Sequence, residues 1–284
     1  MSIVEWLAEP WQYAFMQRAL LTTVIAAVVC AVLSCWLVLI GWSLLGDAVS
    51  HAVLPGVVLA YIVGAPFALG ALVFGGLAVG LIGAVRGSRV KEDAAIGIVF
   101  TTLFALGLVL ISVTPSQTDL NHIVFGNVLG VSATDLVQVA VLAALALGVL
   151  LIKRRDLTLF AFDRDHAHAI GLHPRRLSAL LLGVLALTAV VALQVVGVVL
   201  VVAMLIIPGA TARLLTDRFG RMLVLAPVIS AACAVVGLTL SYWWDASPGG
   251  LVVVVQGVVF AVVFLAAPRY GLIRRLRPSA TVAA

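Results

Sequence analysis

Long uninterrupted apolar stretches constrain this chain more than any other feature. Stretches of about 18 to 25 residues recur along nearly the whole sequence, and an α-helix needs this length to cross the hydrocarbon core of a bilayer. Because lipid cannot satisfy backbone polar groups, each stretch predicts a helix. With 64% hydrophobic and 10% charged residues among 284, little of the chain remains for a soluble domain. The sequence therefore predicts an all-α, multi-pass membrane protein.

The apolar pattern predicts a bundle of eight or nine membrane-spanning helices in one transmembrane domain, residues 1–284. The count depends on region 176–214, which either one long bent helix or two helices could fill. Gly197, Pro208 and Gly209 argue against a straight helix there. The expected spans lie near residues 18–41, 44–63, 66–86, 92–113, 132–152, 176–195, 197–214, 221–243 and 249–268.

Glycines recur within these spans at the spacing of closely packed membrane helices. Gly76 and Gly80 are four residues apart, and so are Gly83 and Gly87. Small residues at this spacing let two helix backbones approach each other. We therefore expect a tight bundle.

Positive side chains set the expected orientation of the spans. Of the 17 Lys and Arg residues, all except Arg18 fall in alternate connections or in the C-terminal tail. By the positive-inside rule these segments are cytoplasmic, and with nine spans the N-terminus is outside and the C-terminus inside. Orientation thus explains the net charge of +5, and no nucleic acid partner is expected.

The stretch LLGDAVSHAVLPG, residues 44–56, places two ionisable side chains inside an apolar span. An Asp at the centre of a membrane helix costs about 2.5–3.5 kcal/mol, so Asp47 needs a partner or a function. His51 lies one turn further on the same helix face, and Pro55 and Gly56 predict a kink just beyond it. A carboxylate oxygen with an imidazole nitrogen suits Mn²⁺, Zn²⁺ or Fe²⁺.

Two interpretations of Asp47 and His51 stand on the residues alone. In the first, the two side chains are transient ligands of a divalent metal ion on its way through the membrane. In the second, Asp47 lies in the first turn of its helix and stabilises the positive N-terminal end, and His51 is a packing residue.

The longest expected cytoplasmic connection, about residues 154–176, predicts a surface helix that docks a partner. Charged residues alternate there with apolar ones, and Gly171 predicts a helix end. The spacing of its three histidines is not that of a metal site. The chain contains no P-loop, so if ATP drives the protein, another polypeptide must bind it, and no enzyme activity is expected. The apolar residues are Leu157, Leu159, Phe160, Phe162, Ile170 and Leu172.

Four motifs resemble the permease subunits of the ABC-3 family, which serve bacterial importers of manganese, zinc and iron. The run GDAVSHAVLPGVVLAY resembles the second-helix signature of that family. A later signature with a central Pro resembles VVGVVLVVAMLIIPGATARLLT. The runs FGNVLGVSATDL and AFDRDHAHAIGL also match, so the resemblance covers nearly the whole chain.

The resemblance implies the helix bundle of a type II ABC importer in the bacterial cytoplasmic (inner) membrane. A divalent transition metal ion would move inward along a dimer interface by alternating access, with Asp47 and His51 as transient ligands and no permanently bound cofactor. ABC ATPase subunits would bind ATP and dock on the coupling region, about residues 154–176. An extracytoplasmic solute-binding protein would deliver the metal, and a second permease copy would complete the dimer. The expected coupling residues are Phe162, Asp163, His166, Ala169 and Gly171.

Two rival functions remain at this point. A permease of the same architecture for an iron–siderophore or a corrinoid needs a wide apolar cavity and has no use for an Asp and His pair. A secondary metal-ion carrier coupled to protons or sodium predicts inverted repeats and uptake without an ATPase. The choice among manganese, zinc and iron stays open, as does the identity of the second permease copy.

Overall fold

The computed structural model describes residues 9–65, 67–85, 92–114 and 128–267. Throughout these ranges the chain forms helices and no strand, which confirms the all-α expectation. Six described helical stretches are long and apolar enough to cross a membrane, one of them (Leu45–Val63) formed by α3 and α4 together, and shorter apolar helices cover 69–85 and 200–215. The elements are η1 (Glu9–Gln12), α2 (Ala14–Ile40), α3 (Ser43–Ala52), α4 (Leu54–Val63), α5 (Phe67–Val85), α6 (Glu92–Val113), η2 (Val128–Gly130), α8 (Ala133–Ile152), α9 (Arg154–Phe162), α10 (Arg164–Ala169), α11 (Pro174–Leu215), α12 (Phe219–Trp244) and α13 (Pro248–Ala266).

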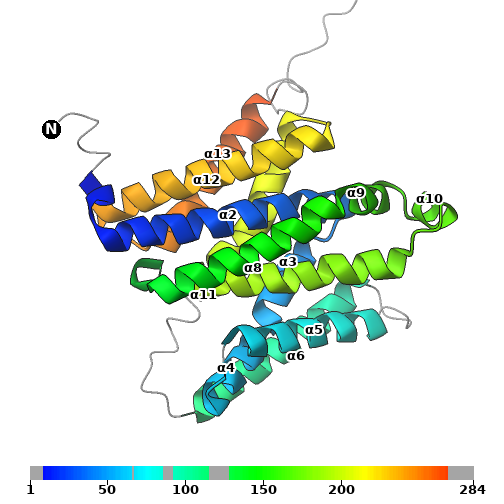
Figure 1. Cartoon of the computed structure of the whole chain (residues 1–284), viewed down its shortest axis with the longest axis horizontal. Coiled ribbons are helices and arrows are strands. Elements are labelled where there is room, and N and C mark those ends of the chain that lie inside the picture. Colours follow the sequence, from blue (N-terminus) through cyan, green and yellow to red (C-terminus); the bar gives the residue numbers. More distant parts are fainter. Residues whose placement is uncertain (1–8, 66, 86–91, 115–127, 268–284) are drawn as a thin grey trace, which may run out of the picture.

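Helix α2 forms the centre of the bundle. It packs against α11 and α12, of which α12 runs beside it in Figure 1, and its Leu33, Trp36 and Leu37 side chains are fully buried. Helices α4, α5 and α6 form a second group, in the lower part of the view, that contacts α3 and α11. Outward faces remain apolar, as Val73 of α5 and Val258 of α13 illustrate, and this is the surface expected of a chain surrounded by lipid.

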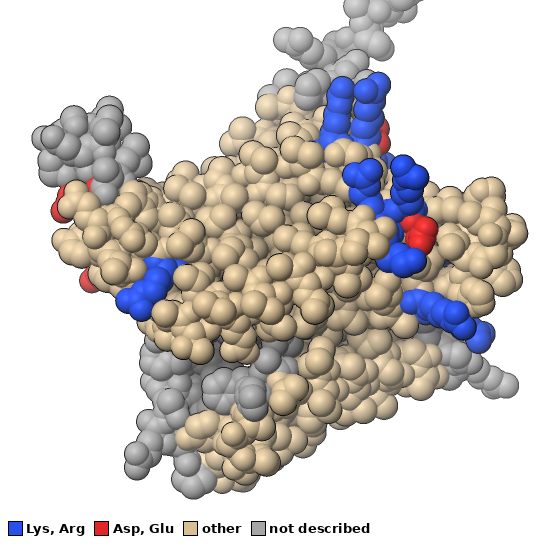
Figure 2. Space-filling view, in the orientation of Figure 1, with Lys and Arg blue, Asp and Glu red and all other residues tan. Residues whose placement is uncertain are grey.

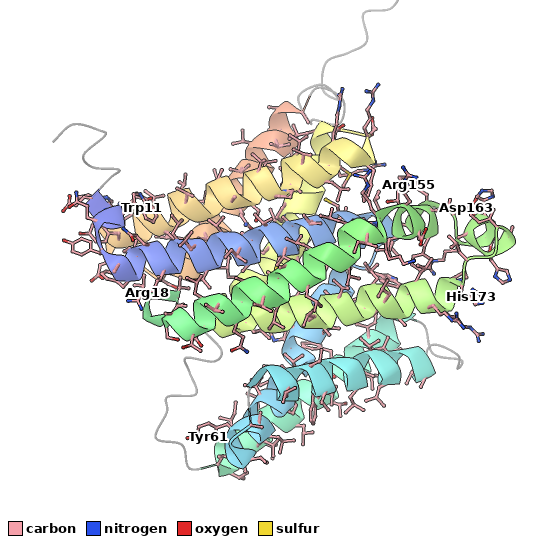
Figure 3. All side chains as sticks on the ribbon, in the orientation of Figure 1. Trp11, Arg18, Tyr61, Arg155, Asp163 and His173 are labelled. Atoms are coloured by element: carbon pink, nitrogen blue, oxygen red, sulfur yellow. The ribbon has the colours of Figure 1, made fainter. Side chains whose placement is uncertain are left out.

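The two ends of the bundle differ in charge. Figure 3 places Arg155 and His173 at one end, and Trp11 and Arg18 at the other. Lys and Arg side chains gather at the first of these ends in Figure 2, and we call it the basic end. It carries the connections on both sides of α11, so the sequence correctly grouped their positive residues on one side.

Helix α11 contains the sharpest break in the described chain. At 42 residues it would be about 63 Å long if straight, twice the thickness of a bilayer core. Gly197 interrupts it with φ 74° and ψ 168°, a conformation that is essentially restricted to glycine. The region therefore consists of two helical arms, whereas Pro208 and Gly209 lie inside a regular helix.

The span expected at 44–63 is divided in two. Helix α3 ends at Ala52 and α4 begins at Leu54, because Pro55 has no N–H to continue the helical hydrogen bonds. At the other end of α3, Gly41 adopts the left-handed conformation with φ 81° and ends α2. The interruption lies where the kink was expected, and α3 is a ten-residue helix between Gly41 and Val53.

The closest helix contact does not involve the glycines that the spacing suggested. Gly56 of α4 and Gly70 of α5 are packed so closely that a Cβ at Gly70 would lie 2.7 Å from the Gly56 carbonyl carbon. In contrast, a Cβ at Gly76, Gly80 or Gly83 would meet no atom of this chain within 4 Å. The expectation that Gly76, Gly80 and Gly83 lie at close helix contacts was therefore wrong within this chain. Gly87 lies outside the described residues.

Candidate functional site

Asp47 and His51 lie on one face of α3 and contact each other. The distance from His51 Nε2 to Asp47 Oδ1 is 3.1 Å, and both side chains are half-buried. The i,i+4 spacing and the helical backbone bring the two groups together without help from another element. An acidic and an imidazole side chain thus form a compact polar pair inside a span that is otherwise apolar.

The structure contradicts the interpretation of Asp47 as a helix-start residue. Helix α3 begins at Ser43 and has no acidic residue in its first turn. Asp47 lies in the second turn, beyond the reach of the free N–H groups at the start of the helix. The carboxylate is therefore available to His51 and to a cation.

Two aromatic side chains of α6 hold the imidazole ring of His51. The ring centroids of Phe100 and Phe104 lie 5.3 and 5.2 Å from that of His51, and the two Phe rings stack on each other at 6.0 Å. The contact buries His51 Nδ1, which has no hydrogen-bond partner among the described residues. Sequence reasoning missed both Phe residues; their i,i+4 spacing on one helix was the available signal.

The pair provides two metal-binding groups. Among the residues that the structure describes, no cluster of three or more His, Cys, Asp or Glu side chains could hold a metal ion. Carboxylate oxygen and imidazole nitrogen together are ligands for Mn²⁺, Fe²⁺ and Zn²⁺.

The coupling region consists of two short helices, α9 and α10, where the sequence suggested one. The chain turns at Asp163, which has an extended backbone, and the Asp163 side chain accepts hydrogen bonds from the N–H groups of Asp165 and His166 at 3.1 and 2.9 Å. Figure 3 shows Asp163 at the basic end. All five residues predicted to contact a partner are exposed there, namely Phe162, Asp163, His166, Ala169 and Gly171.

Some apolar residues of this region have a different role from the expected one. Leu157 and Phe160 are buried and attach α9 to the bundle, so they are not part of a docking surface. Phe162 and Ile170, with exposed fractions of 59% and 57%, remain available for a partner. Gly171 has φ 88° directly after α10, as its expected role at a helix end requires.

Comparisons with known proteins agree with this architecture. The model of the ABC 3 transport family matches residues 12–267. The manganese transport system membrane protein MntB of Synechocystis sp. is 51% identical over 94% of this chain and 88% of its own length. The chelated iron transport system membrane protein YfeD of Yersinia pestis is 47% identical over 91% of this chain and 88% of its own length.

A solved structure has the same fold. PsaBC from Streptococcus pneumoniae, determined in complex with Fab, superimposes with a TM-score of 0.89 at 38% sequence identity. The match covers 96% of this chain and 99% of that one. The family match and the identity of the relatives together establish that this chain is a membrane permease subunit of the ABC 3 transport family.

Proposed function

We propose that this chain forms the membrane pathway of an ATP-driven bacterial importer for a divalent transition metal ion, with Mn²⁺ and Fe²⁺ as the favoured substrates. The observation that carries the proposal is the Asp47–His51 pair, two metal-binding groups 3.1 Å apart inside a membrane span. Support for the substrate class comes from the names of the relatives, which include manganese and chelated iron transport proteins. Zn²⁺ has the same ligand preferences and remains a third substrate to test.

Asp47 and His51 act as transient ligands of the transported ion. In the described conformation His51 Nε2 and Asp47 Oδ1 contact each other, so an arriving cation must replace this contact to bind both side chains. Two ligands from one chain hold an ion weakly enough for release, which a transport pathway requires. A second permease copy related by a two-fold axis supplies another Asp and His pair.

Partner subunits deliver the ion and the energy. ABC ATPase subunits dock at the basic end, which faces the cytoplasm by the positive-inside rule. The docking residues are the predicted coupling residues Phe162, Asp163, His166, Ala169 and Gly171. A solute-binding protein presents the metal at the opposite end, outside the cytoplasmic membrane. ATP binding and hydrolysis on the ATPase then alternate the access of the Asp47–His51 pair between the two sides.

Uptake by the reconstituted complex tests this function. The chain is combined with its ATPase and solute-binding protein in proteoliposomes, and uptake of Mn²⁺, Fe²⁺ and Zn²⁺ is measured with and without ATP. We expect ATP-dependent uptake of Mn²⁺ or Fe²⁺. Uptake of an iron–siderophore alone, or metal uptake by this chain without ATP under a proton or sodium gradient, would contradict the proposal and support one of the rivals.

Phe104 is expected to affect the affinity for the metal. The substitution Phe104→Ala removes one of the rings that hold His51, so the imidazole must lose freedom each time it binds the ion. An aromatic contact of this kind contributes about 0.5–1.5 kcal/mol, which corresponds to roughly a twofold to thirteenfold rise in the apparent KM for Mn²⁺. The control is Phe264→Ala, a change on the exposed face of α13 that should leave KM unchanged. Equal KM values for both variants would show that Phe104 does not position His51.

A further inference from the structure

Three side chains join the coupling region to the helix that bears Asp47 and His51. The guanidinium carbon of Arg164 lies 5.6 Å from the ring centroid of Trp42 and 5.1 Å from that of Phe160. The two rings meet edge to face, with centroids 6.3 Å apart and an interplanar angle of 65°. These distances are typical of cation–π and aromatic pairs. We call Trp42, Phe160 and Arg164 the aromatic clamp.

Trp42 lies at the joint between α2 and α3. It follows Gly41, its N–H donates to the carbonyl of Leu37 at 2.8 Å, and its own carbonyl accepts from the N–H of Leu45 at 3.0 Å. The side chain is 5% exposed, so the surrounding protein fixes the indole ring. A displacement of this ring therefore displaces the first turn of α3, and Asp47 is in the next turn.

The other two members of the clamp connect the core to the surface. Phe160 of α9 is 1% exposed and belongs to the buried core. Arg164 is the first residue of α10 and is exposed at the basic end, next to the predicted coupling residues. Its planar guanidinium covers both rings, a geometry that the ammonium group of a lysine does not reproduce.

Helix α3 is a short helix that begins directly after the turn at Gly41 and Trp42. It has ten residues and lies between the left-handed residue Gly41 and the break at Val53. Val53 keeps helical backbone angles (φ −77°, ψ −14°), so a change in the backbone angles of Gly41 redirects α3 while its internal hydrogen bonds, and hence the Asp47–His51 spacing, persist. A force applied at Trp42 thus acts on the ligand pair as a whole.

We propose that Arg164 is a positioning residue that ties α10 to the first turn of α3, so that movement of a docked ATPase reaches Asp47 and His51 through Trp42. This inference rests on the proposed function, because it assigns the route by which the ATPase changes access to the metal. Arg164 contacts neither the metal nor the nucleotide. Removal of the Arg164 side chain therefore uncouples transport from ATP hydrolysis and leaves the metal site and the nucleotide site intact.

The test compares Arg164→Ala with Arg155→Ala in the reconstituted complex. Both variants lose one exposed positive charge from the coupling region, but only Arg164 belongs to the clamp. Mn²⁺ uptake and ATP hydrolysis are measured on the same proteoliposomes. For Arg164→Ala we expect the number of ions transported per ATP to fall about two- to fivefold, the size expected for loss of a cation–π contact made by an exposed arginine. Arg155→Ala should keep the ratio of the unmodified complex.

Two further variants test the chemistry of the clamp. Trp42→Phe keeps an aromatic face and should retain most of the transport ratio, whereas Trp42→Leu should lower it as Arg164→Ala does. An unchanged ratio in Arg164→Ala overturns the inference. A loss of ATPase from the Arg164→Ala complex also overturns it, because Arg164 is then a docking contact. If the unmodified complex transports no divalent metal, the proposed function fails instead.

Discussion

Replacing Asp47 with alanine is expected to lower ATP-driven Mn²⁺ uptake about a hundredfold or more, the loss expected for removal of a metal ligand when even supporting residues cost tenfold to a hundredfold. Asp47 is the only carboxylate in contact with His51 among the described residues. Without it, the pathway presents one imidazole nitrogen per chain, and the charge that compensates an entering cation is lost. Initial rates of uptake into proteoliposomes, at equal amounts of incorporated complex, measure the effect.

The isosteric change Asp47→Asn separates charge from shape. Asparagine still offers an oxygen to His51 and fills the same volume, so the helix should fold normally, but a neutral amide is a poor ligand for a divalent ion. We expect nearly the same loss of uptake as for alanine. The matched control is Ser50→Ala, since the buried Ser50 hydroxyl only donates to the carbonyl of Gly46 in its own helix. Uptake at the unmodified rate in both Asp47 variants would exclude a metal site at this pair.

The second large effect concerns stability, and it is expected for Gly70→Ala. A Cβ at position 70 would overlap the carbonyl oxygen of Gly56 and lie 2.8 Å from the Cβ of Ala60. The obstacle is the backbone of α4 and not a movable side chain, so the two helices must separate. Overpacking of this kind costs about 1–3 kcal/mol, and the backbone overlap places Gly70→Ala at the upper end of that range.

Helix α5 provides the control for this prediction. Gly76→Ala is the same change in the same helix, and its Cβ would meet nothing within 4 Å. Because alanine favours a helix over glycine by about 1 kcal/mol, Gly76→Ala should be neutral or slightly stabilising. Thermal unfolding of the purified full chain in detergent compares the two variants. Equal midpoints would mean that α4 and α5 are not in backbone contact.

Hydrophobic length predicted most of the fold because the bilayer imposes that length on every span. The expected spans 92–113 and 132–152 agree with α6 and α8 to within one residue. The start of the first span was predicted too late, at the charged residue Arg18: α2 begins at Ala14, four residues earlier. The Arg18 side chain turns back along the helix, where its Nε donates to the carbonyl of Ala14 at 3.3 Å, so a charged residue fits inside the helix.

Only the contacts within α3 could be predicted from the sequence of the candidate site. Asp47 and His51 could be paired from sequence because one helical turn brings them together. Phe100 and Phe104 contact His51 from a different helix, about fifty positions along the chain. A local sequence pattern cannot predict a contact between residues so far apart in the chain. The same holds for Gly56 and Gly70, whose contact depends on how α4 folds back onto α5.

The turn at Gly197 has a consequence for how far this sequence can vary. Its backbone angles are those that only glycine adopts without strain, so position 197 accepts one amino acid. In a library of random substitutions at position 197, nearly all variants that fold should therefore encode glycine, by any of its synonymous codons.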